Sequence, residues 1–314
     1  MISIGISACL LGDKVRFDGG HKNNPYIADV LTPFFKWVRV CPEVEMGLGT
    51  PRESMHILNE KGKLHLKTVK TGQDLTAKFQ KFSEQKLKEI EKLELSGFLL
   101  KKNSPSCGLE RVKVYTDGVP FNDGSGFFAM ALKTSFPDLP LEDEGRLVDA
   151  KLRENWVQRV FVYRRFQDVL KNFSKKALIE FHTRNKMIIL SHNPKAYQEL
   201  GRWIARGKWS KKELLSYRSE VMAALKTPAT PGKHVNVLQH MAGYFKKEIT
   251  ASDREELMAS FDDFKKGYVP LIVPVTLIRH YVRKFEIEYL KDQYYLTPHP
   301  KELALLNHVY TEMP

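Results

Sequence analysis

The N-terminal residues 1–12, MISIGISACLLG, contain a short β-type run that ends just before a cysteine. The same pattern returns at residues 37–41, WVRVC, and at residues 97–107, GFLLKKNSPSC. Segments of helical periodicity separate the three runs, the clearest at residues 74–95. Alternating strands and helices predict an α/β domain with a mostly parallel sheet, in a Rossmann-like, three-layer arrangement.

The three cysteines of the chain, Cys9, Cys41 and Cys107, each follow one of these predicted strands. Ligands of open parallel sheets bind beyond the carboxyl ends of the strands, so we expect the three thiols to converge. Three thiolates suit a metal centre with one vacant position, which leaves open zinc with a bound water and an iron–sulfur cluster. Three unrelated buried thiols are the alternative, because free cysteine is commonly buried.

Groups able to transfer protons lie beside two of these cysteines. Glu43 and Glu45 follow Cys41, and Ser104 and Ser106 precede Cys107. Carboxylates and hydroxyls at such positions are candidates for general acid–base catalysis, although a glutamate here would equally suit surface charge or a helix cap.

The second half of the chain has the periodicity of a helical protein. We expect domains of residues 1–145 and 146–314, separated by a linker rich in proline and acidic residues, FPDLPLEDE. Ser210 and Ser252 each begin a Ser-x-x-Glu capping box, and a long final helix is expected over residues 273–295. The second domain is therefore predicted to be all-α.

Positive charge is concentrated in this helical domain. Residues 1–150 carry 21 Lys and Arg against 20 Asp and Glu, whereas residues 151–314 carry 29 against 17. Such an excess is typical of a surface that binds a polyanion, and a solvated Lys-rich surface is the alternative. The residues that we expect to bind RNA are Lys175, Lys176, Arg202, Arg206, Lys208, Lys211, Lys212, Arg279 and Arg283.

Three loops of the first domain resemble the signature loops of the thiouracil desulfidase (TudS-like) family. The resemblance is carried by SACLLG at residues 7–12, VRFDG at 15–19, CPE at 41–43, GLGTPR at 47–52 and KNSPSCG at 102–108. It implies that Cys9, Cys41 and Cys107 hold a [4Fe–4S] cluster with one open iron. It also implies a non-redox reaction in which a thiocarbonyl sulfur is exchanged hydrolytically for oxygen.

This resemblance directs the assignment of site residues. Glu43 is our first choice as the general base that activates water, and Glu45 is the rival. Ser104, and after it Ser106, would orient the ring or relay a proton. As substrate-binding residues we expect Arg52, which would equally suit pairing with a carboxylate, and Asn103.

The second domain resembles the YbgA-like helical domain that follows desulfidase domains in bacteria. The segments that carry this likeness are FHTRNK at residues 181–186, LSH at 190–192, YQELG at 197–201 and NVLQHMAGYFK at 236–246. The resemblance implies a domain organisation, and it adds no chemistry of its own.

Together these features predict a desulfidase that acts on thiouridine within RNA, with 4-thiouridine in tRNA as the leading substrate. A free base needs no basic platform, whereas phosphate contacts supply affinity for RNA and a splayed nucleotide can enter a site. Two alternatives stay open. One is an enzyme that salvages free thiouracil or thiouridine monophosphate, and the other is a non-catalytic nucleic-acid-binding accessory protein that holds a metal.

Composition excludes several classes of protein. No run of about 18 apolar residues is present, so we expect no membrane span. The N-terminus lacks the basic start and apolar core of a secretory signal, and an odd number of cysteines does not make a disulfide scaffold. We therefore expect a soluble, cytoplasmic protein, and its oligomeric state stays open.

Overall fold

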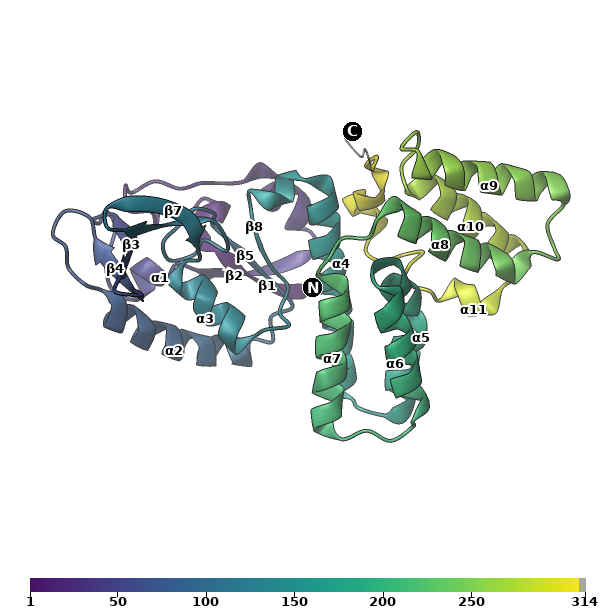
Figure 1. Ribbon diagram of the computed structural model, residues 1–314, viewed down its shortest axis with the longest axis horizontal. Helices are drawn as coiled ribbons and strands as arrows, with labels where there is room; N and C mark the ends of the chain where they lie inside the picture. Colours follow the sequence, from purple (N-terminus) through teal and green to yellow (C-terminus); the bar gives the residue numbers. More distant parts are fainter. Residues whose placement is uncertain (311–314) are drawn as a thin grey trace. The chain divides into compact units, whose positions relative to one another are not determined.

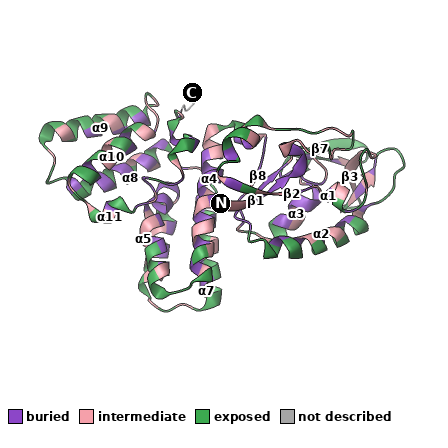
Figure 2. Ribbon diagram, turned by 180° about the vertical axis from the view of Figure 1, so that it is seen from behind, coloured by how far each residue is buried: buried purple, intermediate pink, exposed green. Residues whose placement is uncertain are grey.

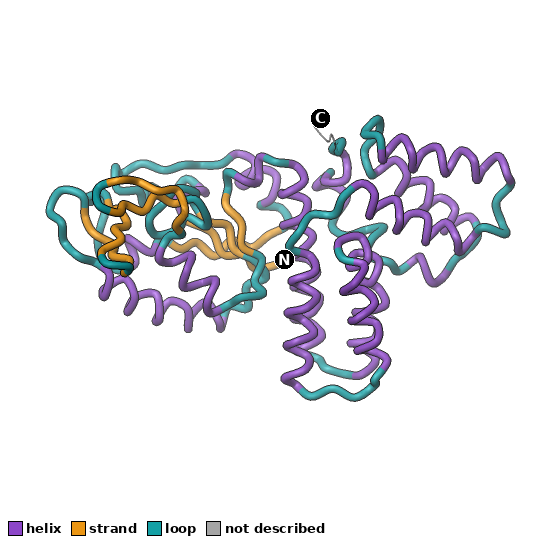
Figure 3. The backbone as a smooth tube through the Cα atoms, viewed as in Figure 1, coloured by secondary structure: helices purple, strands orange, loops and turns teal. Residues whose placement is uncertain are grey.

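The computed structural model describes residues 1–310 and divides the chain into two compact units (Figure 1). Unit 1 is Met1–Val148, and unit 2 begins at Asp149. Figure 3 shows the strands confined to unit 1, and every regular element in the described part of unit 2 is helical. The predicted class, α/β with a mostly parallel sheet followed by helices, is confirmed. Within residues 1–310, no helix is both long enough and apolar enough to cross a membrane.

Four parallel strands form sheet A, in the order β2-β1-β5-β8. Their bounds are β1 Ile2–Ser7, β2 Phe35–Val40, β5 Phe98–Leu100 and β8 Leu141–Asp143. The first three confirm the strands expected from the sequence. Ile4 and Ile6 of β1 and the whole of β5 are fully buried, as is typical of a parallel sheet covered on both faces.

The fourth strand, β8, lies inside the segment that we expected to be a linker. Leu141 pairs with Phe98, and the next two residues, Glu142 and Asp143, are buried. Arg146 satisfies both carboxylates: its Nε donates to Glu142 at 2.7 Å and its backbone N–H donates to Asp143 at 3.0 Å. The linker prediction was wrong here because acidic composition does not reveal that a buried carboxylate has a partner.

A second sheet, sheet B, was not expected. Its order is β4-β3-β6-β7, and only the central β3–β6 pair is parallel. The bounds are β3 Met55–Glu60, β4 Lys63–Thr68, β6 Val112–Thr116 and β7 Val119–Gly124. Strand β6 has the alternation of a half-buried strand, with Val112 and Val114 buried and Lys113 exposed between them. Strand β7 occupies a glycine-rich segment and is exposed over most of its length, so it has no apolar alternation that a sequence pattern could detect.

The helices of unit 1 pack beside these sheets. They are α1 Pro42–Glu45, α2 Thr76–Lys92 and α3 Phe127–Ser135, with a π-helical segment at Tyr26–Leu31 and 3-10 turns at Ala8–Leu11 and Arg146–Val148. The apolar stripe of α2 is buried at Phe79 and Ile90, and Phe79 packs edge-on against Phe127 of α3. Leu93 lies beyond the end of α2 and is exposed.

Unit 2 contains eight α-helices in the part that the structure describes. Their bounds are α4 Ala150–Lys171, α5 Lys175–His192, α6 Pro194–Ala205, α7 Lys211–Leu225, α8 Pro231–Ala242, α9 Ala251–Lys265, α10 Ile272–Lys284 and α11 Glu288–Lys291. Short 3-10 turns lie at Gly243–Phe245, Lys301–Leu303 and Leu305–Asn307. Buried positions run along α4 and α5 (Figure 2).

Two helix boundaries in unit 2 differ from the sequence predictions. The expected final helix is broken at Glu286, whose φ of 50° lies in the left-handed region and separates α10 from α11. The predicted capping box at Ser210 is present, with Glu213 as its second member. The second box is formed by Thr250 and Asp253 rather than by Ser252, because either hydroxyl satisfies the same sequence pattern.

Candidate active site

A cavity of about 380 Å³ lies at the carboxyl ends of the strands of sheet A. Cys9 lies in the 3-10 turn after β1, Cys41 directly follows β2, and Cys107 lies in the loop after β5. All three cysteines line this cavity. Parallel strands bring their carboxyl ends to one edge of the sheet, which is why three cysteines far apart in the sequence meet.

Burial disfavours the thiolate form of all three cysteines. Burial, followed by the neighbouring Cys41, raises the pKa of the Cys9 thiol to about 11. Burial also raises the pKa of Cys41 and of Cys107, and the charges of Cys9 and Cys41 add to the effect on Cys107. The three sulfurs are therefore close enough to repel one another as thiolates. A metal centre removes this penalty because it binds thiolates and displaces their protons.

The donor set fits an iron–sulfur cluster. Three thiols around one cavity are soft ligands of the kind that such clusters use. Within residues 1–310, no three His, Cys, Asp or Glu side chains are placed to hold one metal ion together. Cysteines that share a cluster bind different irons and need not meet at one point.

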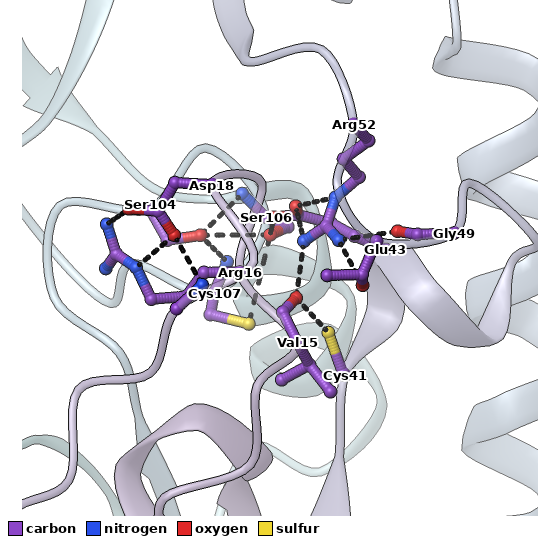
Figure 4. A network of polar contacts seen from close by, with 12 residues as sticks. Val15, Arg16, Asp18, Cys41, Glu43, Gly49, Arg52, Ser104, Ser106 and Cys107 are labelled. Carbon is purple, nitrogen blue, oxygen red and sulfur yellow. Dashed lines mark hydrogen bonds and ion pairs between the residues drawn. The ribbon is translucent and has the colours of Figure 1, made fainter.

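Glu43 is the acidic residue among the described residues that line the cavity, and both of its carboxylate oxygens are held (Figure 4). Pro42 begins α1 and thereby places Glu43 in its first turn. Arg52 donates to Oε2 from Nε at 2.7 Å and also from Nη2, while Ser106 Oγ donates to Oε1. The Glu43 side chain is 14% exposed. It is therefore oriented without being sealed from the cavity.

Arg52 is committed to holding this arrangement. Besides the two contacts to Glu43, its Nη1 donates to Gly49 O at 2.8 Å and to Thr50 Oγ1 at 3.4 Å, and its Nη2 donates to Val15 O at 2.9 Å. A guanidinium has five N–H groups, and these five contacts use them. Of the two roles expected for Arg52, the structure shows the pairing with a carboxylate: Arg52 orients Glu43 and ties the loop after α1 to the loop after β1.

Ser104 and Ser106 form a short hydroxyl chain that leads to Glu43. Their Oγ atoms lie 2.9 Å apart. Ser104 lines the cavity, whereas Ser106 is buried between Ser104 and Glu43. Ser104 Oγ also accepts the backbone N–H of Cys107 at 3.1 Å. Hydroxyls donate and accept at once, so this chain can pass a proton between the cavity and the carboxylate.

The structure corrects the placement of Glu45 as a rival base. Its Oε1 accepts the backbone N–H of Cys41 at 2.9 Å, and its Oε2 pairs with Lys86 of α2 at 2.9 Å. Glu45 therefore holds the backbone at Cys41 against α2 and does not line the cavity. Two glutamates two positions apart in a helix face different directions, so both cannot reach one site.

Basic residues for which no role was expected also line the cavity. Arg16, Lys101 and Lys102 line the cavity together with Lys22 and the predicted Asn103. Lys101 pairs with Glu144, and the Lys101 backbone N–H donates to Ser7 Oγ at 3.0 Å. Lys102 is exposed. Their position in the sequence could have predicted this, because Lys101 and Lys102 directly follow β5, just as the cysteines follow their strands.

The basic residues expected to bind RNA occupy two places in unit 2. Those on α5, α6, α7 and the turn between α6 and α7 are exposed; they are Lys175, Lys176, Arg202, Arg206, Lys208, Lys211 and Lys212. Arg279 and Arg283 lie on α10, away from that turn (Figure 1). Arg279 is half-buried and donates to Leu296 O, so it holds the segment after α11, while Arg283 is exposed.

Comparisons with known proteins cover both units. Residues 4–144 match the model of the 2-thiouracil desulfurase family, and residues 186–300 match a family described as a protein of unknown function, DUF1722. The uncharacterized protein YbgA of Escherichia coli (strain K12) is 33% identical over 135 residues, which cover 42% of this chain and 80% of YbgA. The uncharacterized protein YbbK of Bacillus subtilis (strain 168) is 32% identical over 133 residues, which cover 41% of this chain and 87% of YbbK.

One solved structure is also similar, that of a [4Fe-4S]-dependent thiouracil desulfidase, TudS. It is 30% identical, with a TM-score of 0.38, and the match covers 47% of this chain and 94% of TudS. The desulfurase family model covers the part of the chain that carries the three cysteine loops. The chain belongs to the 2-thiouracil desulfurase family and carries a YbgA-like helical domain behind its desulfurase domain.

Proposed function

We propose that this chain is a desulfidase that replaces the thiocarbonyl sulfur of 4-thiouridine in tRNA by oxygen. The observation that carries the proposal is one cavity lined by three cysteines and one oriented carboxylate. The reaction consumes one water and releases one sulfide: C=S + H₂O gives C=O + H₂S. No electrons are transferred, so the site has to supply polarisation of the C=S bond and proton transfer only.

Cys9, Cys41 and Cys107 would hold the cofactor, a [4Fe–4S] cluster. When bound, a cluster with three protein ligands supplies an open iron, a Lewis acid that matches a soft thiocarbonyl sulfur. The backbone at two of the cysteines is held independently of the cofactor. Glu45 accepts the Cys41 N–H, and Ser104 accepts the Cys107 N–H. The chain is thereby preorganised to bind the cluster.

Glu43 is the base in this proposal. Its carboxylate takes a proton from the water that attacks the thiocarbonyl carbon, a role that requires an ionised and oriented group. Arg52 fixes the direction of this carboxylate through two charge-assisted hydrogen bonds. Ser106 and Ser104 connect the other carboxylate oxygen to the cavity wall, so the proton can return to the leaving sulfide.

The basic residues at the cavity support a phosphorylated substrate over a free base. Lys22 and Lys102 line the cavity beside the cysteines, and a neutral thiouracil ring has no group that needs them, whereas Arg16 already pairs with Asp18. Thiouridine monophosphate is therefore the second candidate, since it and a tRNA nucleotide both carry a phosphate. The positive charge of unit 2 favours tRNA.

The test uses the full-length protein, reconstituted with iron and sulfide without oxygen. We expect release of sulfide from tRNA that contains 4-thiouridine, with uridine formed in equal amount. In the Cys41→Ala variant we expect the rate to fall by at least about 100-fold, because one of the three cluster ligands is removed. Iron analysis of both proteins would show whether the cluster itself is absent.

The outcomes separate the candidate functions. Turnover of thiouridine monophosphate with none on tRNA would leave the chemistry intact and remove the tRNA substrate. Protein that binds zinc but no iron under these conditions, and releases no sulfide, would contradict the desulfidase proposal and favour a non-catalytic metal-containing protein.

A further inference from the structure

Two turns meet at one end of unit 2 and present aromatic rings among lysines. Residues 172–174 connect α4 to α5, and residues 206–210 connect α6 to α7. Figure 1 draws both at the same end of these helices, and a Cβ built on Gly207 would lie 3.4 Å from Lys175 Nζ. We call the two turns with the first residues of α5 and α7 the helical tip.

A stack of aromatic rings runs from the core of unit 2 to this tip. Phe166 stacks on Tyr217 at 5.8 Å, Tyr217 on Trp203 at 4.8 Å, and Trp203 on Trp209 at 5.4 Å, with interplanar angles of 24–30°. Tyr217 is fully buried, whereas Trp209 is half-buried. Among the described residues, no further ring stacks on Trp209. The stack therefore ends at the surface on an indole, and Phe173 in the other turn of the tip is 46% exposed.

The rings at the tip are held in place before any partner binds. Trp209 Nε1 donates to Trp203 O at 3.2 Å, so the indole has one orientation. Gly207 adopts a φ of 74°, which lets the chain reverse sharply after α6. Ser174 caps α5, and Ser210 forms a capping box with Glu213 at the start of α7. A fixed platform loses little conformational entropy on binding.

Among the described residues, the lysines at the tip have no carboxylate paired with them, whereas Arg206 interacts electrostatically with Glu213 in the first turn of α7. The carboxylates nearest in sequence already have partners: Asp168 pairs with Arg164, Glu180 pairs with Arg184, and Glu213 accepts the Ser210 N–H. No ion pair within residues 1–310 involves the exposed cations of the tip, which are Lys175, Lys176, Arg206, Lys208, Lys211 and Lys212. The cations can bind the phosphates of a nucleic acid, and the flat ring can stack on one of its bases.

We propose that the helical tip binds an unpaired segment of RNA, with one base stacked on Trp209 and neighbouring phosphates held by the lysines. Proteins bind single strands by this combination of an aromatic platform and a cationic surround. An anionic membrane surface is disfavoured, because interfacial helices bury a whole apolar face and the tip offers two rings. The proposal rests on the proposed function, because it identifies the surface that binds the RNA substrate of the desulfidase.

The experiment measures binding of the full-length protein to unmodified tRNA and to a short oligouridylate by fluorescence anisotropy. For Trp209→Ala we expect affinity to fall roughly 5- to 150-fold, the range for removal of one stacked base. Trp209→Phe should keep most of the affinity. For the double variant Lys208→Ala, Lys212→Ala we expect the slope of log affinity against log salt to fall by about 0.7 for each phosphate that the protein no longer neutralises.

A matched control removes two exposed lysines from unit 1, in the variant Lys61→Ala, Lys63→Ala, which lowers the net charge equally and should leave affinity unchanged. Circular dichroism melting and sulfide release from free 4-thiouracil establish that each variant is folded. Tip variants that bind RNA as tightly as the wild type would contradict the proposal that the helical tip binds RNA, and they would leave the desulfidase proposal unaffected. Tip variants that lose their binding to phosphatidylserine vesicles but keep their binding to RNA would show instead that the helical tip binds an anionic membrane surface. Wild-type protein that releases sulfide from 4-thiouracil but binds no RNA would contradict both the RNA-binding role of the helical tip and the proposal that tRNA is the substrate.

Discussion

Glu43 and Glu45 show how much a residue's function depends on its direction. Both belong to the four-residue helix α1, yet Glu43 points to the cavity and Glu45 pairs with Lys86 and the Cys41 backbone. The Ser106–Glu43–Arg52 contacts join helix α1 to the loop after it and to the loop after β5. One carboxylate is thereby held in a single direction, which is what a general base requires.

Substitution of the two glutamates should separate these roles. Glu43→Gln keeps the shape and removes the base, so we expect sulfide release to fall by at least about 100-fold with little change in KM. Glu45→Gln loses an ion pair that is partly exposed, so we expect activity within about twofold and a cost below about 1 kcal/mol in the free energy of unfolding. Sulfide release and thermal melting measure the two effects. An equal fall in activity in both variants would contradict the assignment of Glu43.

Helix α3 acts on the site as an element, through its first turn. The N–H groups of a helix start have no partner within the helix. Here Gly126 donates to Gly108 O at 2.8 Å, Phe127 to Pro105 O at 3.0 Å and Phe128 to Ser106 O at 2.8 Å. The start of α3 therefore holds the loop that carries Ser104, Ser106 and Cys107, and the loop in turn satisfies the helix.

Gly126→Ala should disrupt this packing. A Cβ on Gly126 would lie 2.5 Å from the Ser106 carbonyl and 2.8 Å from Gly108 N, both backbone atoms that cannot turn aside. We expect a decrease of about 2–4 kcal/mol in the free energy of unfolding and a lower iron content after reconstitution. Gly232→Ala is the matched control, because nothing lies within 4 Å of its Cβ position, and its stability should be unchanged or slightly raised. Equal effects of the two substitutions would refute the role given to Gly126.

At the scale of the molecule, the helical unit buries titratable groups whose pKa values are displaced in opposite directions. Burial lowers the pKa of His182, His192 and His299 to about 4 and that of His234 to about 3. Burial raises the pKa of Glu154 to about 8, although Tyr310 donates to it at 2.9 Å. Each of these groups is therefore buried in its neutral form.

These displacements predict a maximum of stability near neutral pH. A histidine whose folded pKa is lowered loses its stabilising contribution as the pH falls from 6.5 towards 4. A carboxyl whose folded pKa is raised keeps its contribution below about 4.5 and loses it as the pH rises to about 8. With four such histidines and one glutamate, stability should rise to about pH 6.5 and then decline.

The Glu154→Gln variant isolates the alkaline part of this profile. Glutamine stays neutral, so we expect the decline between about pH 6.5 and 8 to disappear, a gain on the order of a few kcal/mol at about pH 8.5 relative to the wild type. Urea unfolding of the full-length protein, followed by helical circular dichroism, measures it. A variant that keeps the wild-type slope above about pH 6.5 would show that Glu154 is not the group responsible.

The sequence by itself determined the elements that depend on local interactions. Three strands of sheet A, helix α2 and the all-helical unit 2 follow from periodicity, and the cysteines after β1, β2 and β5 predicted a common edge. Tertiary structure decided what depends on partners distant along the chain. Strand β8 and the exposed strand β7 form because neighbouring strands pair with them. Contacts between loops and helices decide that Glu43 and not Glu45 faces the cavity, and that Arg52 binds Glu43. Such contacts also build the aromatic stack that ends at Trp209. A pattern along the chain reports the periodicity of one element, whereas the direction of a side chain and the partner of a buried charge are set by what packs against it.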